Sequence, residues 1–223
     1  LNRTQRENLH FGGKGVNVAR VLHALGVDCV AIAPVAGAQG KEFSDLTARE
    51  QVPLRAVPVS GETRRIDTYV RRSDYAQRVV RQDGPRLTAH EIEAIREAVL
   101  DRLEQFAVLA VCGSASCPQG AALIPELISE AKRRGLRTLL DANQQALIQG
   151  ASALPDVLKL NETELAQLLG PSSDPLHGEA ARLIQNGVGR VLLTLGERGC
   201  AQFLGEQVAF CPSPRVKCVN AVG

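Results

Sequence analysis

A glycine-rich segment near the N-terminus combines a lysine with an asparagine. In Phe11–Asn17 (FGGKGVN), three glycines surround Lys14 and lead into the helix pattern of residues 18–25. Glycines let a backbone approach a ligand closely, and a helix N-terminus offers free N–H groups and positive potential. Lys14 and Asn17 could therefore bind an anionic or hydroxyl-rich ligand, although a glycine-rich helix start without a ligand fits equally well. The segment is not a P-loop, because Gly15 follows the lysine, and it is not a GxGxxG dinucleotide fingerprint.

A second polar motif, Leu158–Glu164 (LKLNETE), follows an apolar run and begins a helix pattern. Asn161 and Glu164 could position hydrated Mg²⁺ and phosphate oxygens, because Mg²⁺ prefers oxygen ligands and keeps several waters. The same two residues also fit an ordinary helix cap, in which Glu164 reaches back to the backbone of Asn161. This motif alone favours the cap.

Three further strand ends carry polar or glycine residues. The segment LTLGERG, with Thr194, Gly196 and Gly199, fits either a nucleotide-binding turn or a plain β-turn. Ser114 comes shortly after the apolar run 107–112, and Asp141 closes the run 138–140. In an open parallel sheet, ligands collect at the carboxyl ends of the strands, so we expect these ends to share one site.

The elements that would position these residues alternate along the chain. Apolar runs at 29–35, 107–112, 138–140, 157–160 and 191–195 predict strands, and helical spacing predicts helices at 91–103, 124–133, 161–169 and 179–185. This order predicts an α/β fold with a mainly parallel sheet flanked by helices on both faces. The segment Val52–Gln82 is instead polar and arginine-rich, and it predicts a small antiparallel excursion. Such a hairpin either covers a ligand or lies on the surface without a role.

The composition limits the class of protein. With 223 residues, 44% of them hydrophobic, and a formal net charge of +2, the chain fits a single globular domain over residues 1–223. The small net charge gives no basic footprint for nucleic acid, and no apolar run approaches the ~20 residues that span a bilayer. Six isolated cysteines without a CxxC pair favour buried free thiols and a cytoplasmic location. The absence of methionine suggests a processed or excised piece.

The order and spacing of these motifs together resemble the PfkB (ribokinase-like) family of carbohydrate kinases. The resemblance rests on GGKGVNVARVLHALG, GETRRI, GSASCPQG, LLDAN, LKLNETEL, LTLGERG and VNAVG, which span essentially the whole chain. GGKGVNVARVL and ETR look more like 1-phosphofructokinase and tagatose-6-phosphate kinase than like ribokinase. The resemblance implies a ribokinase-like fold with a small β-sheet lid at about residues 1–12 and 52–82. Lid strands of this family often pair between subunits, which implies a homodimer.

The resemblance also implies a reaction and a role for each matching residue. The implied reaction is ATP-dependent phosphorylation of a ketohexose phosphate to the bisphosphate, with ATP and Mg²⁺ as cofactors. Glu164 would hold the metal through water, and Asp141 matches a strand-end Asp of the family. The sugar phosphate would contact Gly13, Lys14, Asn17, Arg64 and Ser114, and ATP would contact Lys159, Asn161, Glu164, Thr194, Gly196, Gly199 and Gly223.

The chain departs from the family pattern at both ends and in two motifs. VNAVG stops at Gly223, where the family continues as GAGD, which supplies the anion hole and the catalytic Asp. We therefore expect the catalytic base just beyond Gly223, a chain truncated at both ends, and no appreciable turnover by these 223 residues alone. GSASCPQG replaces GSLPxG and KLN replaces KPN, and both changes weaken the match.

Two alternatives remain open at the level of sequence. A ribokinase-like or nucleoside kinase would act on an uncharged sugar, so Lys14 and Arg64 would matter less for binding. A catalytically inactive sugar- or nucleotide-binding remnant would lack a downstream AGD in the parent gene. An NAD-binding oxidoreductase is disfavoured by the missing fingerprint. The kinase interpretation requires Lys14, Arg64, Ser114, Asn161 and Gly196 to lie at one rim of the sheet.

Overall fold

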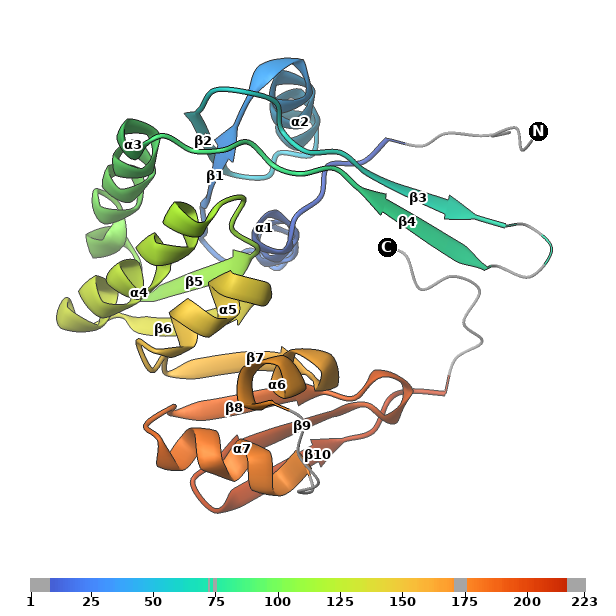
Figure 1. Ribbon diagram of the computed structural model, residues 1–223, viewed down its shortest axis with the longest axis vertical. Helices are drawn as coiled ribbons and strands as arrows, with labels where there is room; N and C mark the ends of the chain where they lie inside the picture. Colours follow the sequence, from blue (N-terminus) through green and yellow to red (C-terminus); the bar gives the residue numbers. More distant parts are fainter. Residues whose placement is uncertain (1–8, 72, 74–75, 171–175, 216–223) are drawn as a thin grey trace.

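A six-stranded sheet with strand order β10-β9-β8-β7-β6-β5 forms the larger part of the structure (Figure 1). The structure is a computed structural model that describes residues 9–71, 73, 76–170 and 176–215. Strands β5 to β8 run parallel, whereas β9 and β10 are antiparallel to their neighbours. The strands are β5 (Val108–Gly113), β6 (Arg137–Ala142), β7 (Val157–Asn161), β8 (Arg190–Thr194), β9 (Cys200–Leu204) and β10 (Gln207–Cys211).

Helices connect the parallel strands and cover one face of the sheet. They are α4 (Pro118–Arg133), α5 (Gln144–Ala151), α6 (Glu162–Leu169) and α7 (Leu176–Gln185). Leu140, Leu158, Leu160 and Val191 are fully buried in the core that these helices share with the strands. Burial alternates along β6, β7 and β8, so the helix-covered face is packed more tightly than the opposite one. The predicted mainly parallel α/β fold is confirmed.

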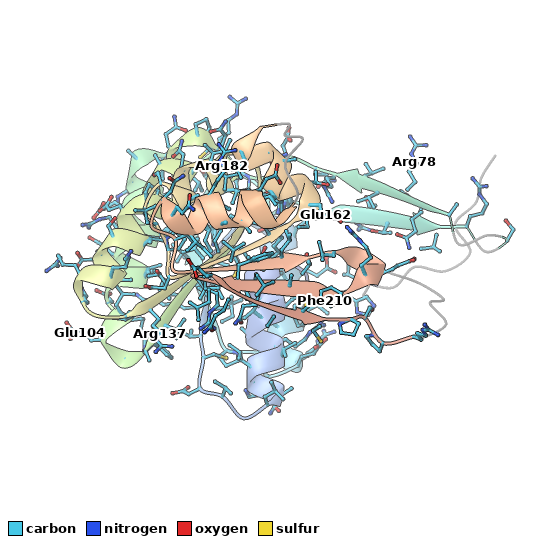
Figure 2. All side chains as sticks on the ribbon, turned by 90° about the horizontal axis from the view of Figure 1, so that it is seen from below. Arg78, Glu104, Arg137, Glu162, Arg182 and Phe210 are labelled. Atoms are coloured by element: carbon cyan, nitrogen blue, oxygen red, sulfur yellow. The ribbon has the colours of Figure 1, made fainter. Side chains whose placement is uncertain are left out.

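A smaller parallel pair, β1 (Ala31–Val35) with β2 (Leu54–Pro58), extends the body beyond β5 (Figure 1). It is surrounded by α1 (Lys14–Ala24), α2 (Gly37–Arg49) and α3 (Ala89–Leu100), and a short 3₁₀ turn (Leu103–Gln105) follows α3. Ile32 of β1 packs into a cluster with α3 and α4, which joins the pair to the main core. Helix α1 contacts β5, and Figure 2 shows it on the opposite side of the sheet from α7.

The hairpin of β3 (Ile66–Val70) and β4 (Gln77–Arg81) projects from the body (Figure 1), and we call this hairpin the lid. The prediction of one antiparallel excursion over Val52–Gln82 is wrong at its start. Residues 54–58 form β2, which pairs in parallel with β1 inside the body, because Val52 and Val57 are buried there. Of the other predicted lid segment, residues 1–8 lie outside the described residues, and 9–12 form neither helix nor strand.

Candidate active site

The carboxyl ends of β5 to β8 bring the predicted polar residues to one edge of the sheet. In the parallel register, Cys112 is the partner of Asp141, and Asn161 is the partner of Thr194. Ser114 directly follows the last residue of β5. The parallel arrangement therefore explains why residues from four separate motifs share an edge, where ligands of such sheets collect.

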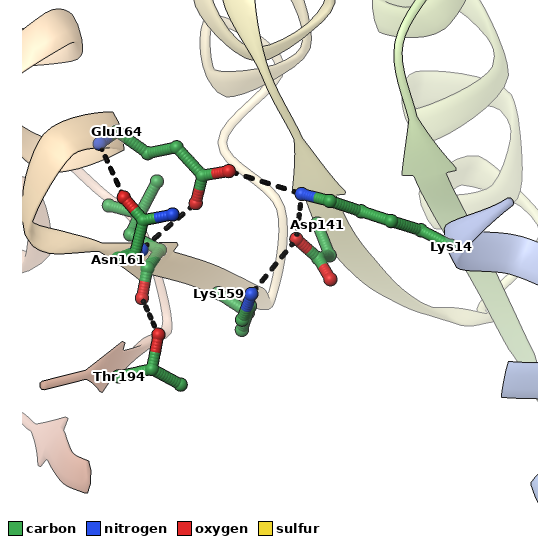
Figure 3. A network of polar contacts seen from close by, with 7 residues as sticks. Lys14, Asp141, Lys159, Asn161, Glu164 and Thr194 are labelled. Atoms are coloured by element: carbon green, nitrogen blue, oxygen red, sulfur yellow. Dashed lines mark hydrogen bonds and ion pairs between the residues drawn. The ribbon is translucent and has the colours of Figure 1, made fainter. Parts of the chain in front are cut away.

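Lys14 joins the glycine segment to this edge (Figure 3). Its ammonium lies 2.8 Å from Asp141 Oδ1 and 3.1 Å from Glu164 Oε1. The side chains are 32%, 18% and 9% exposed, respectively. Burial by itself lowers the pKa of Lys14, but the hydrogen bonds and charges of Asp141 and Glu164 outweigh it and raise the pKa above its ordinary value. Lys14 is thus a fixed cation at the sheet edge.

Asn161 and Glu164 form the helix cap that the sequence favoured. Glu164 N donates to Asn161 Oδ1 at 2.8 Å, and Asn161 N donates to Glu164 Oε2 at 2.9 Å, which completes a capping box at the start of α6. The other carboxylate oxygen of Glu164 accepts from Lys14 (Figure 3). The helix cap is therefore part of the charged cluster, because it fixes the Glu164 carboxylate that pairs with Lys14.

A second lysine completes the cluster. Lys159 Nζ lies 3.3 Å from Asp141 Oδ1, so Asp141 faces two ammonium groups. Cys112, beside Asp141 in the register, is half-buried, and its burial together with the charge of Asp141 raises the pKa of its thiol to about 11. A thiol with this pKa stays protonated near neutral pH, so Cys112 is not an activated nucleophile.

Arg64 reaches the same edge from the root of the lid. Its guanidinium donates to Ser114 Oγ at 2.8 Å. The two residues before it fix the chain to the body: Thr63 Oγ1 accepts from Ala36 N at 2.8 Å, and the Glu62 carboxylate accepts from backbone N–H groups in the first turn of α2. The GETR motif therefore anchors the lid root and leaves Arg64 directed at Ser114. The anchoring role of Glu62 and Thr63 was not predicted.

A pocket of about 560 Å³ lies beside the charged cluster. Its lining includes the cap and the glycine turn, with Asn161, Glu162, Thr163, Thr194, Gly196, Gly199, Cys200 and Cys211–Pro214. Thr194 Oγ1 donates to Leu160 O at 3.2 Å, which ties β8 to β7 beneath the pocket (Figure 3).

Gly199 is the position in this turn where a side chain cannot fit. Its φ is +106°, and a Cβ there would lie 2.1 Å from Cys211 O and 2.7 Å from Ser213 N. The absence of a side chain therefore lets the chain after β10 pass directly over the turn and form a wall of the pocket. Gly196, at φ +58°, has open space around it.

The structure gathers the predicted residues into two clusters and the pocket. Lys14 and Lys159 pair with Asp141, Lys14 also pairs with Glu164, and Asn161 caps Glu164. Arg64 pairs with Ser114. Gly13 caps α1 with φ +119°, and its carbonyl accepts from the backbone of Asn17, whose side chain is exposed. Gly223 lies outside the described residues. Asp141 is the residue that sequence reasoning placed without a defined role, although its position after an apolar run was the available signal.

A mainly parallel open sheet with charged residues and a pocket at its carboxyl edge is typical of α/β proteins that bind small ligands there. The sequence profile described as pfkB family carbohydrate kinase matches residues 1–223. The chain belongs to this family.

Individual relatives agree with this assignment. The chain is 32% identical over 221 residues to the ATP-dependent 6-phosphofructokinase isozyme 2 of Escherichia coli (strain K12), with 95% of this chain and 70% of the relative covered. It is 27% identical over 229 residues to the 1-phosphofructokinase of Bacillus subtilis (strain 168), covering all of this chain and 73% of that relative. The crystal structure of E. coli phosphofructokinase-2 in complex with fructose-6-phosphate superposes with a TM-score of 0.82 at 28% identity, over 92% of this chain and 69% of that one.

Among the helices of the described ranges, none has the length and apolar character that spanning a bilayer requires.

Proposed function

We propose that the protein transfers the terminal phosphoryl group of ATP to a hydroxyl of a ketohexose phosphate and forms the bisphosphate. The observation that carries this proposal is the meeting of two cations from separate elements at one sheet edge. Lys14 enters from the start of α1 and Arg64 from the lid root. Relatives named for phosphorylating sugar phosphates support the same substrate class.

The nucleotide and the sugar phosphate bind at different parts of the sheet edge. The nucleotide occupies the pocket between α6 and the glycine turn, with its phosphates near Asn161 and Lys159. The sugar lies under the lid root, where the guanidinium of Arg64 and the hydroxyl of Ser114 bind its phosphate. Lys14 stands between the two and stabilises the charge on the phosphoryl group in transfer. This extends the predicted role of Lys14, which was contact with the sugar phosphate.

Glu164 could hold a divalent metal at this edge only through water. Both oxygens of Glu164 already accept hydrogen bonds, from Lys14 and from Asn161 N, so direct coordination would break an existing contact. The described residues contain no group of three or more His, Cys, Asp or Glu that could hold a metal directly. Mg²⁺ suits such a site because it keeps several waters and binds through one or two carboxylates and substrate phosphates. Glu164 and Asp141 would hold it, and it would neutralise phosphate charge when bound.

Binding measurements test the substrate class directly, without any need for turnover. Calorimetric titration should show that fructose 6-phosphate, fructose 1-phosphate or tagatose 6-phosphate binds and that fructose and ribose do not. Arg64→Ala removes a hydrogen bond to a charged phosphate, which is worth about 1.5–3 kcal/mol, so affinity should fall by roughly 10- to 150-fold.

The matched control is Arg78→Ala, which changes an exposed arginine on β4 of the same lid (Figure 2). It should leave sugar phosphate affinity within about twofold, since an exposed charge distant from the site contributes little. Tighter binding of ribose or fructose than of any sugar phosphate would replace this proposal with the ribokinase-like alternative.

The lid also supports a proposal about assembly. Its two strands expose a set of large apolar side chains, and a hairpin of this kind is unstable when it stands alone in water. We propose that two copies pair through their lids into a homodimer. A relative whose structure is described as the tetrameric inhibited form of E. coli phosphofructokinase-2 shows that oligomers occur among these proteins. The exposed residues are Ile66, Tyr69, Val70, Val79 and Val80.

A further inference from the structure

Two cysteines face each other across the last antiparallel strand pair. Cys200 begins β9, Cys211 ends β10, and their Cα atoms are direct partners in the register. Both side chains are exposed and both thiols are free. Directly opposite residues of an antiparallel pair have Cα atoms about 4.5 or 5.5 Å apart, and disulfides span Cα distances of about 4.4–6.8 Å. The strand register therefore already meets the backbone condition for a disulfide.

This pair of cysteines is aligned with the nucleotide side of the proposed active site. Thr194 is the register partner of Cys200, and Asn161 is the register partner of Thr194. The four residues thus form one row across β7, β8, β9 and β10. All four also line the 560 Å³ pocket. A change at the cysteines therefore acts on the pocket itself.

The packing at Gly199 leaves the pocket wall little freedom to absorb such a change. The backbone of Cys211, Pro212 and Ser213 passes so close to Gly199 that a single added carbon would overlap it. The Sγ of Cys211 contacts Pro212 O, at 3.8 Å, and would have to leave this position to reach Cys200. Joining the two sulfur atoms therefore rotates the Cys211 side chain out of this contact and places an S–S bridge between two residues that line the pocket.

We propose that Cys200 and Cys211 are a reversible oxidation site that couples thiol redox state to nucleotide binding, an inference that rests on the proposed function of the pocket. The oxidant class is a peroxide. One thiolate attacks an oxygen of hydrogen peroxide, which breaks the O–O bond, gives a sulfenic acid and releases water after protonation. The second thiol then attacks that sulfur, the S–S bond forms, and a second water leaves. A dithiol reverses the step by two successive exchanges.

A peptide map tests the chemistry without any use of kinase activity. Trypsin cleavage after Arg198 and Arg215 releases both cysteines in a single peptide, Gly199–Arg215, which contains no other Lys or Arg. After peroxide treatment and alkylation, this peptide should carry no alkyl group and should lack two hydrogen atoms. In the reduced protein it should carry two alkyl groups. Cys200→Ser should abolish the bridge and leave Cys211 open to alkylation once dithiol has been added.

Nucleotide titration tests the coupling. Oxidised protein should bind a non-hydrolysable ATP analogue about tenfold more weakly or worse, and by reciprocity a saturating analogue should slow formation of the bridge. Cys200→Ser should show the same affinity before and after peroxide. The control Cys29→Ser changes a thiol that contacts Ala19 O, away from the pocket, and should lose affinity on oxidation like the unmodified protein.

The outcomes separate the two proposals. If the reduced protein binds no nucleotide, the proposed function fails, while the alkylation pattern still decides whether the cysteine pair is an oxidation site. If peroxide leaves both cysteines open to alkylation, or if the bridged protein binds the analogue as tightly as the reduced one, this inference is overturned.

Discussion

Replacing Lys14 by methionine removes the positive charge that lies between Asp141 and Glu164 and keeps a side chain of similar length. The two carboxylates are 18% and 9% exposed, and each lies about 3 Å from the lysine ammonium in the structure, at 2.8 and 3.1 Å. Exposed ion pairs contribute about 0–1 kcal/mol, whereas breaking a buried pair costs about 3–5 kcal/mol. Because this cluster is partly buried, the cost of removing Lys14 should lie between these two limits.

The remaining contacts lower the expected cost. Asp141 keeps Lys159 at 3.3 Å, and Glu164 keeps its hydrogen bonds with Asn161 in the cap. We therefore predict that Lys14→Met lowers the free energy of unfolding by about 1–2 kcal/mol. With a urea slope of about 2 kcal/mol per M, the midpoint should fall by roughly 0.5–1 M. Affinity for an ATP analogue should fall by about 10- to 150-fold, the range expected for loss of a charged hydrogen bond.

The pH dependence gives this prediction a distinctive signature. The folded pKa of Lys14 is raised above its ordinary value of 10.5, so its contribution to stability is fully present below pH 10.5 and is lost as pH rises through the folded pKa. The difference in unfolding free energy between the two proteins should accordingly shrink above pH 10.5. Urea unfolding followed by circular dichroism at a series of pH values measures this difference in unfolding free energy.

The matched control is Lys41→Met, at an 80% exposed lysine that pairs with Asp45 one helical turn away. It should change the urea midpoint and the nucleotide affinity very little, because exposed pairs of this spacing contribute about 0.3–0.5 kcal/mol. Equal behaviour of the two variants would refute the view that Lys14 is a fixed cation of the site.

Three further predictions concern the cap of α3, the glycine turn and the lid. Hydrogen bonds from the backbone and side chain at Thr88 and from Ser60 N lower the pKa of Glu91 to about 2, so its contribution to stability is present above its ordinary pKa of 4.5 and is lost as pH falls towards about 2. Glu91→Gln should therefore flatten the acid limb of a stability-versus-pH curve. Gly199→Ala should lower the free energy of unfolding by more than the roughly 1–3 kcal/mol that its backbone conformation costs a non-glycine residue, because the added Cβ also overlaps neighbouring backbone. The control Gly205→Ala, at φ +54° in open space, should show only the conformational cost in the same urea assay. Val79→Glu in the lid should shift the protein towards monomer in sedimentation velocity, and an unchanged sedimentation coefficient would count against lid pairing.

The sequence alone predicted the strands and helices whose apolar residues lie on the buried face of the element. The five predicted strands correspond to β1 and β5–β8, and the five predicted helix patterns correspond to α1, α3, α4, α6 and α7. In each case, strong apolar runs or helical spacing agree with the face that is buried.

The missed elements lack that agreement. Helix α2 has the sequence GAQGKEFSDLTAR, with few apolar residues. It is stabilised by packing on β1 and β2, and backbone N–H groups of its first turn donate to the Glu62 carboxylate. Strand β10 is exposed along its whole length and exists through its pairing with β9. Helix α5 begins at Gln144 with a positive φ of 52°, which no local preference predicts.

The site was predicted residue by residue, but its contacts were not. Local patterns could place Lys14 and Glu164 at helix starts, whereas Arg64 was implied by the family resemblance alone. The ion pair between Lys14 and Glu164 joins residues 150 positions apart, and the pair between Lys14 and Asp141 spans 127 positions. Contacts of that range depend on the strand order of the sheet, which the single sequence did not specify.

The anchored lid root determines where the hairpin can bend. The outgoing chain is bonded to the body through Glu62, Thr63 and Arg64, and the returning chain packs at Gly84 against Ser116. Bending that keeps these contacts must therefore occur beyond them, at the base of the two strands. Each lid strand has five residues, about 17 Å at ~3.4 Å per residue, so a bend of about 10° at their base displaces the tip by roughly 3 Å. The far end of the hairpin can thus shift while the position of Arg64 stays fixed.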